Sequence, residues 1–309
     1  IGVWRSHISG MRFEIFKGDE PAGIRGDSCY RMFYSANAAL GPQECIGVYL
    51  LSQGAGFGAG NYQDMERAGI YMRYKKTLKA EFLSRPNRFI AKVLLNGKEE
   101  TVHVKNTGRC RELLIPGVKV VLSESEKATR KTKYDLVCVY KTGVGWINID
   151  SQAPNQVVKE WLVCQLSKNV TKELLLYPNL DFFKPEYVFG SSRLDFYLEE
   201  GEEKCLMEVK GVTLEREGIG YFPDAPTLRG VKHLEELTQA LDMGYQCYLA
   251  FVIQMEGISV VEPNVDTHPE FGEALLRAKN AGVHILYLMC KVTEESMEIT
   301  EIREEKNML

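Results

Sequence analysis

Apolar and polar residues alternate most regularly in two neighbouring segments near the middle of the chain. The segments run from Arg193 to Leu198 and from Cys205 to Lys210, and a Glu-rich stretch that contains Gly201 separates them. Two apolar-rich segments around such a turn are typical of a β-hairpin. A two-residue turn that starts at Gly201 pairs Glu200 with Glu203 and thereby sets the register.

This register brings chemically active side chains together. It places Asp195 directly opposite Glu208 on the neighbouring strand. Because side chains alternate between the two faces of a strand, Glu208 and Lys210, two residues apart, share the face that carries Asp195. Two carboxylates and one ammonium group are therefore expected on one small patch.

The pattern around this hairpin predicts a mixed α/β domain. An apolar stripe between Val157 and Leu166 predicts a helix, with Asn155 as its N-cap residue. Three strands, a second helix and a buried strand follow, and then one more helix and strand; the tail from Thr293 to Leu309 is polar. The further elements are expected at Phe182–Phe189, Arg193–Leu198, Glu203–Val212, Tyr245–Ile253, Phe271–Ala281 and Val283–Cys290.

The second helix is predicted to begin near Pro226, which suits a first helical turn, and to end at Gly244. Its apolar stripe consists of Leu228, Val231, Leu234 and Leu241. Its other face carries Arg229, Lys232, His233 and Glu236, which are neighbours by helical spacing. The loop before this helix, from Gly218 to Pro226, is either a lip that faces substrate or a packed connection, and Pro223 favours the second.

Between residues 72 and 150 the pattern indicates short strands without helices. The strands are expected at Thr77–Leu83, Arg88–Leu95, Glu99–Val104, Val118–Leu122, Tyr134–Tyr140 and Trp146–Ile149. Asn96-Gly97 is a strong signal for a tight hairpin turn. This pattern predicts a small barrel of the OB type. We therefore expect three parts: an extension of unclear structure at 1–71, an OB-like nucleic-acid-binding domain at 72–150 and an α/β domain at 151–309.

The charge is divided unevenly between the two folded domains, although the net charge of the chain is only −4. Residues 72–150 hold 17 Lys and Arg against 8 Asp and Glu, whereas residues 151–309 hold 15 against 27. A basic domain beside an acidic one suggests that the first attracts a polyanion and the second supplies carboxylates. The alternative is that the basic face is ordinary solvated surface.

Basic residues of the barrel gather at strand ends and loops, with Phe89, Tyr134 and Trp146 among them. This mixture suits contact with a nucleic-acid backbone together with base stacking, although the aromatic residues could equally form barrel core. The candidate nucleic-acid-binding residues of the whole chain are Arg85, Arg88, Lys105, Arg109, Arg111, Arg193, Arg229, Lys232 and His233.

The paired carboxylates indicate a metal site. Repulsion between Asp195 and Glu208 disappears if a divalent cation lies between them, and Mg²⁺ (or Mn²⁺) suits one or two carboxylates with water and phosphate as further ligands. Lys210 can then hold a water molecule or stabilise developing charge, which is the chemistry of phosphodiester hydrolysis. Glu160, on the preceding helix, is a candidate third acid. The alternative for the hairpin alone is a solvated Lys/Glu pair.

Other sequence features narrow the class of protein. No apolar run approaches the roughly 18 residues that cross a bilayer, and the eight cysteines are scattered without zinc or CxxC spacing. The start, Ile1-Gly2-Val3, has neither a signal pattern nor an initiator methionine. We expect a cytosolic protein without a membrane contact, disulfides or zinc, and a chain that can be a fragment at its N-terminus.

Several motifs resemble the sugar fermentation stimulation protein family. They are Lys105-Asn106-Thr107-Gly108, Ser192-Arg193-Leu194-Asp195-Phe196, Glu208-Val209-Lys210-Gly211-Val212-Thr213-Leu214, Gly220-Tyr221-Phe222-Pro223-Asp224-Ala225 and Arg229-Gly230-Val231-Lys232-His233-Leu234. The match covers about Met72 to Cys290. It implies an N-terminal OB-like barrel, a C-terminal restriction-endonuclease-like domain of the PD-(D/E)xK type, DNA binding and a role in regulating sugar utilisation genes.

In that nuclease superfamily the metal acids come from the first helix, the second strand and the Glu-x-Lys strand. The matching positions are Glu160, Asp195 and Glu208 with Lys210; Leu194 stands where the superfamily often has proline. Two functions remain open: a Mg²⁺-dependent nuclease that binds DNA, and a non-catalytic DNA-binding regulator that keeps the nuclease fold. The intact set of two acids and a lysine favours the first.

Overall fold

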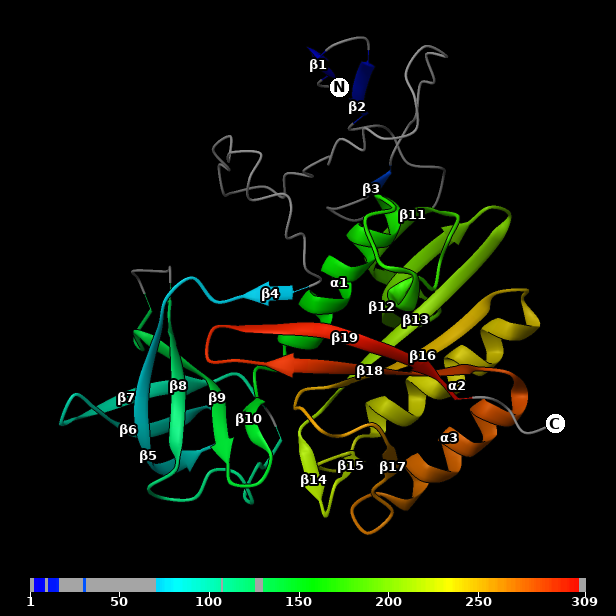
Figure 1. Cartoon of the computed structure of the whole chain (residues 1–309). Coiled ribbons are helices and arrows are strands. Elements are labelled where there is room, and N and C mark those ends of the chain that lie inside the picture. Colours follow the sequence, from blue (N-terminus) through cyan, green and yellow to red (C-terminus); the bar gives the residue numbers. More distant parts are fainter. Residues whose placement is uncertain are drawn as a thin grey trace.

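The computed structural model describes residues 3–8, 11–16, 30–31, 71–106, 108–125 and 130–305 (Figure 1). Strands β1 (Val3–Ile8) and β2 (Met11–Phe16) pair with each other, and β3 (Tyr30–Arg31) pairs with β11 (Leu180–Phe189). Apart from these strands and Tyr71, the predicted extension at 1–71 lies outside the described residues.

A closed β-barrel follows, as the short strands predicted (left in Figure 1). Strand β9 closes it, because it pairs with both β7 and β8, and β10 pairs with the second half of β9, beyond the residues that pair with β7. The strands are β5 (Thr77–Asn87), β6 (Ile90–Leu95), β7 (Lys98–Val104), β8 (Lys119–Glu124), β9 (Tyr134–Lys141) and β10 (Gly145–Asn148).

The Asn-Gly turn forms where the sequence predicts it, between β6 and β7. Asn96 and Gly97 have φ angles of 51° and 77°, and Leu95 pairs with Lys98 across the turn. Two residues with positive φ are what a tight hairpin of matching twist requires, and Asn and Gly accept this conformation most readily.

The second domain is built on one eight-stranded mixed sheet. Its strand order is β3-β11-β12-β13-β16-β18-β19-β4, in which β13, β16 and β18 are parallel. Its further strands are β12 (Ser192–Glu200), β13 (Glu203–Val212), β16 (Gln246–Ile253), β18 (His284–Val292), β19 (Ser296–Glu304) and β4 (Tyr71–Arg73). Its helices are α1 (Ala153–Leu166), η2 (Lys172–Leu174), α2 (Leu228–Asp242) and α3 (Pro269–Ala281).

Helices cover both faces of this sheet (Figure 1). Ala250 and Val252 of β16 pack with the buried side of α1, whereas Leu249 and Phe251 pack with α2 and α3. This alternation along one strand is the result of side chains that point to opposite faces. The predicted fold class, an OB-like barrel followed by a restriction-endonuclease-like mixed-sheet domain, is confirmed.

The polar tail contains a strand that the sequence analysis missed. Strand β19 pairs with β18 and β4, and its Met297 and Ile299 are buried. Only these alternate residues face the core, so the segment reads as polar overall. Because β4 joins β19, residues 71–73 belong to the large sheet and not to the barrel.

Both helix starts differ from the prediction. Helix α1 begins at Ala153 with Gln152 as N-cap, so Asn155 lies inside the first turn; Pro154, which fits an early helical position, explains the earlier start. In α2 the N-cap is Thr227, whose side chain accepts a hydrogen bond from the Gly230 N–H at 3.0 Å, and Pro226 precedes the helix.

The orientation of α2 also differs from the predicted apolar stripe. Leu228 is 81% exposed, whereas His233, Leu237 and Ala240 are buried against the sheet. The helix is therefore rotated so that a histidine faces the core. There, His233 is bonded to the carboxylate of Glu208 on β13, a residue distant in sequence.

A small sheet of the second domain contacts the barrel, where Lys141 of β9 is bonded to Glu215. It contains β14 (Leu214–Arg216), β15 (Ile219–Phe222) and β17 (Val261–Pro263). The loop at 218–226 is thus partly a strand, and Pro223 is buried, which fits the packed connection. Among the described helices, none is long and apolar enough to cross a membrane.

Candidate functional site

The hairpin of β12 and β13 has the register that the sequence predicts. Glu200 pairs with Glu203, and the ladder continues to Phe196 and Met207. Asp195 and Glu208 are the next residues on their strands. They lie where β12 stops pairing with β13, while Glu208 pairs on its other side with β16.

Glu208 is almost completely enclosed, with 2% of its surface exposed. Its Oε1 atom accepts hydrogen bonds from Lys210 Nζ and is bonded to His233 Nδ1 of α2. Its Oε2 atom is buried and has no partner among the described residues. Burial alone would raise the pKa of this carboxyl group, but Lys210 and His233 together outweigh burial and lower the pKa below its usual value.

Asp195 is bonded to helix α1, which covers the face of the sheet opposite to α2. Its Oδ1 accepts a hydrogen bond from Asn155 Nδ2 at 2.6 Å, and its Oδ2 accepts one from the Val209 N–H at 2.8 Å. Burial and then the charge of Glu208 raise the pKa of Asp195 to about 6, against the opposing effect of Lys210. The two carboxylates are thus electrostatically coupled, although each is anchored to a different helix.

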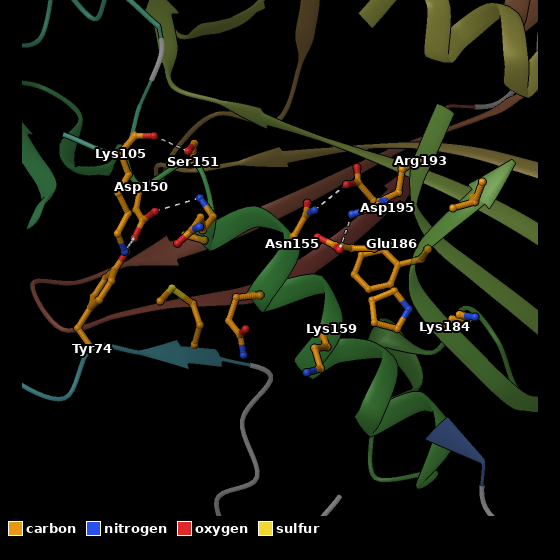
Figure 2. Close-up of a pocket in the computed structure, with 17 residues that line it drawn as sticks. Tyr74, Lys105, Asp150, Ser151, Asn155, Lys159, Lys184, Glu186, Arg193 and Asp195 are labelled. Carbon is orange, nitrogen blue, oxygen red and sulfur yellow. Dashed lines mark hydrogen bonds and ion pairs between the residues drawn. The ribbon is translucent and has the colours of Figure 1, made fainter. Parts of the chain in front are cut away.

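Helix α1 presents Asn155 to Asp195 (Figure 2), and Glu160 lies five residues later on the same helix. Five residues correspond to a rotation of roughly 140° around a helix, so the two side chains point in different directions. Glu160 Oε1 accepts a hydrogen bond from Gln156 Nε2 at 2.6 Å. In the described parts of the chain, no hydrogen bond or ion pair joins Glu160 to Asp195 or Glu208.

A cleft of about 710 Å³ opens beside Asp195. Figure 2 shows Tyr74, Lys105 and Asp150 toward one end of it and Asn155, Asp195 and Arg193 toward the other. The cleft therefore lies between residues at the end of the barrel domain and the hairpin that carries the acids. Its basic lining residues are Lys105, Lys159, Lys184 and Arg193.

The predicted basic residues of the barrel differ in what their side chains contact. Arg85 donates four hydrogen bonds to the backbone carbonyls of Arg88, Asn106, Gly108 and Arg109, at 2.7 to 3.0 Å. The guanidinium group of Arg85 thus organises the loop after β7. The guanidinium of Arg88 instead lies 4.6 Å from the ring centroid of Phe89, which is 45% exposed.

Lys105 lies in the cleft and pairs with Asp150 at 3.0 Å and with Asp135 at 3.6 Å. Arg109 and Arg111 have exposed side chains on the loop that Arg85 organises. The basic residues of this domain therefore do not form one uniform surface: some are bound by carboxylates or carbonyls and others face solvent.

The basic residues of the second domain are also of two kinds. Arg193 is exposed and pairs with Glu186 at 3.2 Å, and Lys232 is exposed and lies 3.8 Å from Glu236. His233 is only 2% exposed, and its Nε2 atom is 3.2 Å from Arg229 Nε. His233 therefore lies behind Glu208 and not on the surface where we expected it to contact nucleic acid.

Sequence reasoning missed three residues of the site. Asn155 was interpreted as an N-cap, and the proline before it was the signal that places it inside the helix. Lys159 follows Asn155 by four residues, so it shares the same helical face and lines the cleft. Lys184 lies on β11 with 4% of its surface exposed, and no pattern in the sequence marks it.

Within the described ranges, no three His, Cys, Asp or Glu side chains converge on one point. A cation between Asp195 and Glu208 would therefore take its remaining ligands from amide, water or phosphate oxygens. Hard cations such as Mg²⁺ commonly bind in this way.

Comparisons with known proteins agree with this architecture. Residues 83–149 match the family described as "SfsA N-terminal OB domain", and residues 152–296 match "Sugar fermentation stimulation protein RE domain". The chain is 55% identical over 227 residues to a sugar fermentation stimulation protein homolog of Desulfitobacterium hafniense, and 50% identical over 230 residues to one of Clostridium beijerinckii. Each alignment covers 74% of this chain and at least 95% of the relative.

A solved structure is also similar, that of Pyrococcus furiosus SfsA in complex with Ca²⁺. It has a TM-score of 0.64 and 27% sequence identity, and the match covers 74% of this chain and 96% of that chain. The barrel, the mixed sheet and the sequence motifs thus agree with both domains of one family. The chain belongs to the sugar fermentation stimulation protein family.

Proposed function

We propose that this protein binds DNA and hydrolyses its phosphodiester bonds with the help of Mg²⁺ or Mn²⁺. The observation that carries the proposal is the pair of carboxylates at the end of the β12–β13 ladder. Glu208 keeps one buried oxygen without a partner among the described residues, and its charge acts on Asp195. A buried polar atom without a partner is costly, and a bound cation would remove both this cost and the repulsion.

The chemistry of the donors fits a hard divalent cation. Asp195 and Glu208 offer carboxylate oxygens, and the nearby His233 uses its Nδ1 atom for the bond with Glu208 Oε1. The similar structure from Pyrococcus furiosus is a complex with Ca²⁺, which prefers the same kind of ligand. When bound, such a cation would activate a water molecule and neutralise charge on the phosphate.

The protein's own side chains would hold and polarise the reacting groups. Lys210 is 13% exposed at its side chain and bonds Glu208, so its ammonium group stays beside the carboxylate pair. From there it can orient a water molecule or stabilise negative charge that develops on a phosphate oxygen. Asn155 and the Val209 N–H fix both oxygens of Asp195, which limits its movement.

The cleft supports the nucleic-acid part of the proposal. Lys105, Lys159 and Arg193 line it, and the exposed Arg88 and Phe89 lie on the barrel. Basic side chains attract the phosphate backbone, and exposed aromatic rings can stack on bases. The excess of Lys and Arg in residues 72–150 acts in the same direction over a longer distance.

Cleavage of labelled single- and double-stranded DNA tests the proposal. The purified full chain is assayed with Mg²⁺, with Mn²⁺ and with a chelator, beside Asp195→Asn, Lys210→Met and the control Asp266→Asn, which changes a carboxylate that is 86% exposed. We expect metal-dependent cutting that both site variants reduce at least about 100-fold, with DNA binding and the control unaffected. DNA binding by the wild type without any cutting would support the regulator that lacks catalysis.

A further inference from the structure

A chain of three side chains runs from the surface of α2 to the candidate metal site. Arg229 and His233 are four residues apart on α2 and therefore neighbours on one face. Arg229 is exposed and its Nε atom lies 3.2 Å from His233 Nε2. The other ring nitrogen, His233 Nδ1, is bonded to Glu208 Oε1 on β13.

The contact with Arg229 determines which ring nitrogen carries the proton. A guanidinium N–H can only donate, so Nε2 of His233 must accept and offers its lone pair. A neutral imidazole then carries its proton on Nδ1, which faces Glu208. His233 is thus a hydrogen-bond donor to the carboxylate.

Two donors from different elements reach the same carboxylate oxygen. Lys210 Nζ approaches Glu208 Oε1 from β13 itself, and His233 Nδ1 approaches it from α2. The lysine is a flexible chain with several rotatable bonds, whereas the histidine is a rigid ring on a buried helix face. The histidine therefore restricts the rotation of the carboxylate more strongly and leaves Oε2 as the oxygen without a partner among the described residues.

We propose that His233 is a positioning residue that orients Glu208 so that Oε2 faces the divalent cation, and that Arg229 holds His233 in the tautomer that can do so. This inference rests on the proposed function, because it needs a cation at the carboxylate pair. Hydrogen bonds to a ligating carboxylate commonly affect metal affinity 10- to 100-fold when they are removed. The role replaces the expected contact of His233 with nucleic acid.

Two amide variants of different length separate positioning from simple packing. In His233→Asn, the side-chain nitrogen can take the place of Nδ1 and still donate to Glu208. In His233→Gln, the longer amide reaches the place of Nε2 instead. Both amides are neutral and polar, so they differ mainly in whether the donor to Glu208 is kept.

Binding of Mn²⁺ alone to the purified full chain is measured by isothermal titration calorimetry. We expect His233→Asn to bind within about threefold of the wild type and His233→Gln to bind about 10- to 100-fold more weakly. Thermal unfolding without metal provides the comparison for folding. Equal affinities of wild type, His233→Asn and His233→Gln for Mn²⁺ would overturn the positioning role while the proposed function stands.

The tautomer is read independently by long-range ¹H–¹⁵N NMR spectra of the metal-free protein, with His233→Asn used to assign the signal. We expect a proton on Nδ1 in the wild type and a mixture of tautomers in Arg229→Met. A proton on Nε2 in the wild type would contradict the proposal. Absence of Mn²⁺ binding by the wild type would instead refute the proposed function, and the positioning role with it.

Discussion

The carboxylate of Asp224, in the loop after β15, accepts a hydrogen bond from the backbone N–H of Cys110 at 3.2 Å. The two residues belong to different domains, so this bond fastens the loop after β7 to the mixed-sheet domain. Gly108 lies close by: a Cβ atom on it would clash with the same oxygen of Asp224. Two of the sequence motifs therefore meet at one contact.

This contact predicts a specific pattern of stability. Gly108→Ala would push Asp224 away from Cys110, and Asp224→Ala would remove the acceptor altogether. We expect each change to lower the free energy of unfolding by about 1–3 kcal/mol, as for a buried donor left unsatisfied. Because both break the same bond, the double variant should cost little more than either single variant. Urea unfolding of all four proteins measures this, and fully additive costs would show that the two residues act independently.

Substitution by alanine is expected to lower stability at Arg85 and to weaken DNA binding at Arg88. Arg85→Ala removes four hydrogen bonds to backbone carbonyls and should lower the free energy of unfolding by about 1–3 kcal/mol. Arg88→Ala should leave stability nearly unchanged but weaken binding to single-stranded DNA and reduce the salt dependence of binding by about one phosphate contact. Each variant loses one positive charge, so one serves as the control for the other. Equal losses of DNA affinity would indicate that only net charge matters.

The elements that set the site were predictable because they depend on local pattern. Alternation and the turn at Gly201 predict the β12–β13 register, and the Asn96-Gly97 turn predicts its hairpin in the barrel. These features need only the chain's own neighbours along the sequence. They are sufficient to bring Asp195 and Glu208 to the same end of one hairpin.

The rotation of the helices could not be predicted in the same way. Whether Asn155 or Glu160 faces Asp195, and whether His233 or Leu228 faces the sheet, depends on how each helix packs on strands that are distant in sequence. In α2 a polar contact with Glu208 outweighs the burial of one leucine at the helix end. A pattern of apolar residues carries no information about such a polar partner.

The effect of a bound metal on stability tests whether Glu160 is a ligand in addition to Asp195. A cation that binds only the folded state raises the free energy of unfolding by about 2.7 kcal/mol at 100 times its dissociation constant. We expect Mn²⁺ to raise the thermal midpoint of the wild type and of Glu160→Gln, because Glu160 is bonded to Gln156 and does not line the cleft that contains Asp195. Asp195→Asn should abolish the shift. If Glu160→Gln also loses the Mn²⁺-dependent rise of the thermal midpoint, Glu160 is a metal ligand, as the family resemblance implies.

A carboxylate network in the barrel predicts how stability depends on pH. Asp135 is 5% exposed and accepts hydrogen bonds from Arg130 at 2.7 and 2.9 Å, and its Oδ1 lies 2.9 Å from His103 Nδ1. Burial opposes ionisation, but Arg130, His103 and Lys105 together outweigh it and lower the pKa of Asp135 below its ordinary value of 3.8. The folded state therefore binds a proton at Asp135 less readily than the unfolded state does.

The lowered pKa of Asp135 in the folded state determines how its contribution to stability changes with pH. Asp135 contributes stability above the ordinary pKa of aspartate, and the contribution is lost as the pH falls through the lower pKa of the folded state. Asp135→Asn should therefore cost about 1–3 kcal/mol at pH 7 and progressively less below about pH 4, where the wild type also becomes neutral at this position. Urea midpoints of both proteins between pH 7 and pH 3 test it, with Asp266→Asn as the exposed control. A difference between wild type and Asp135→Asn that stays constant with pH would mean that packing, and not charge, makes Asp135 important.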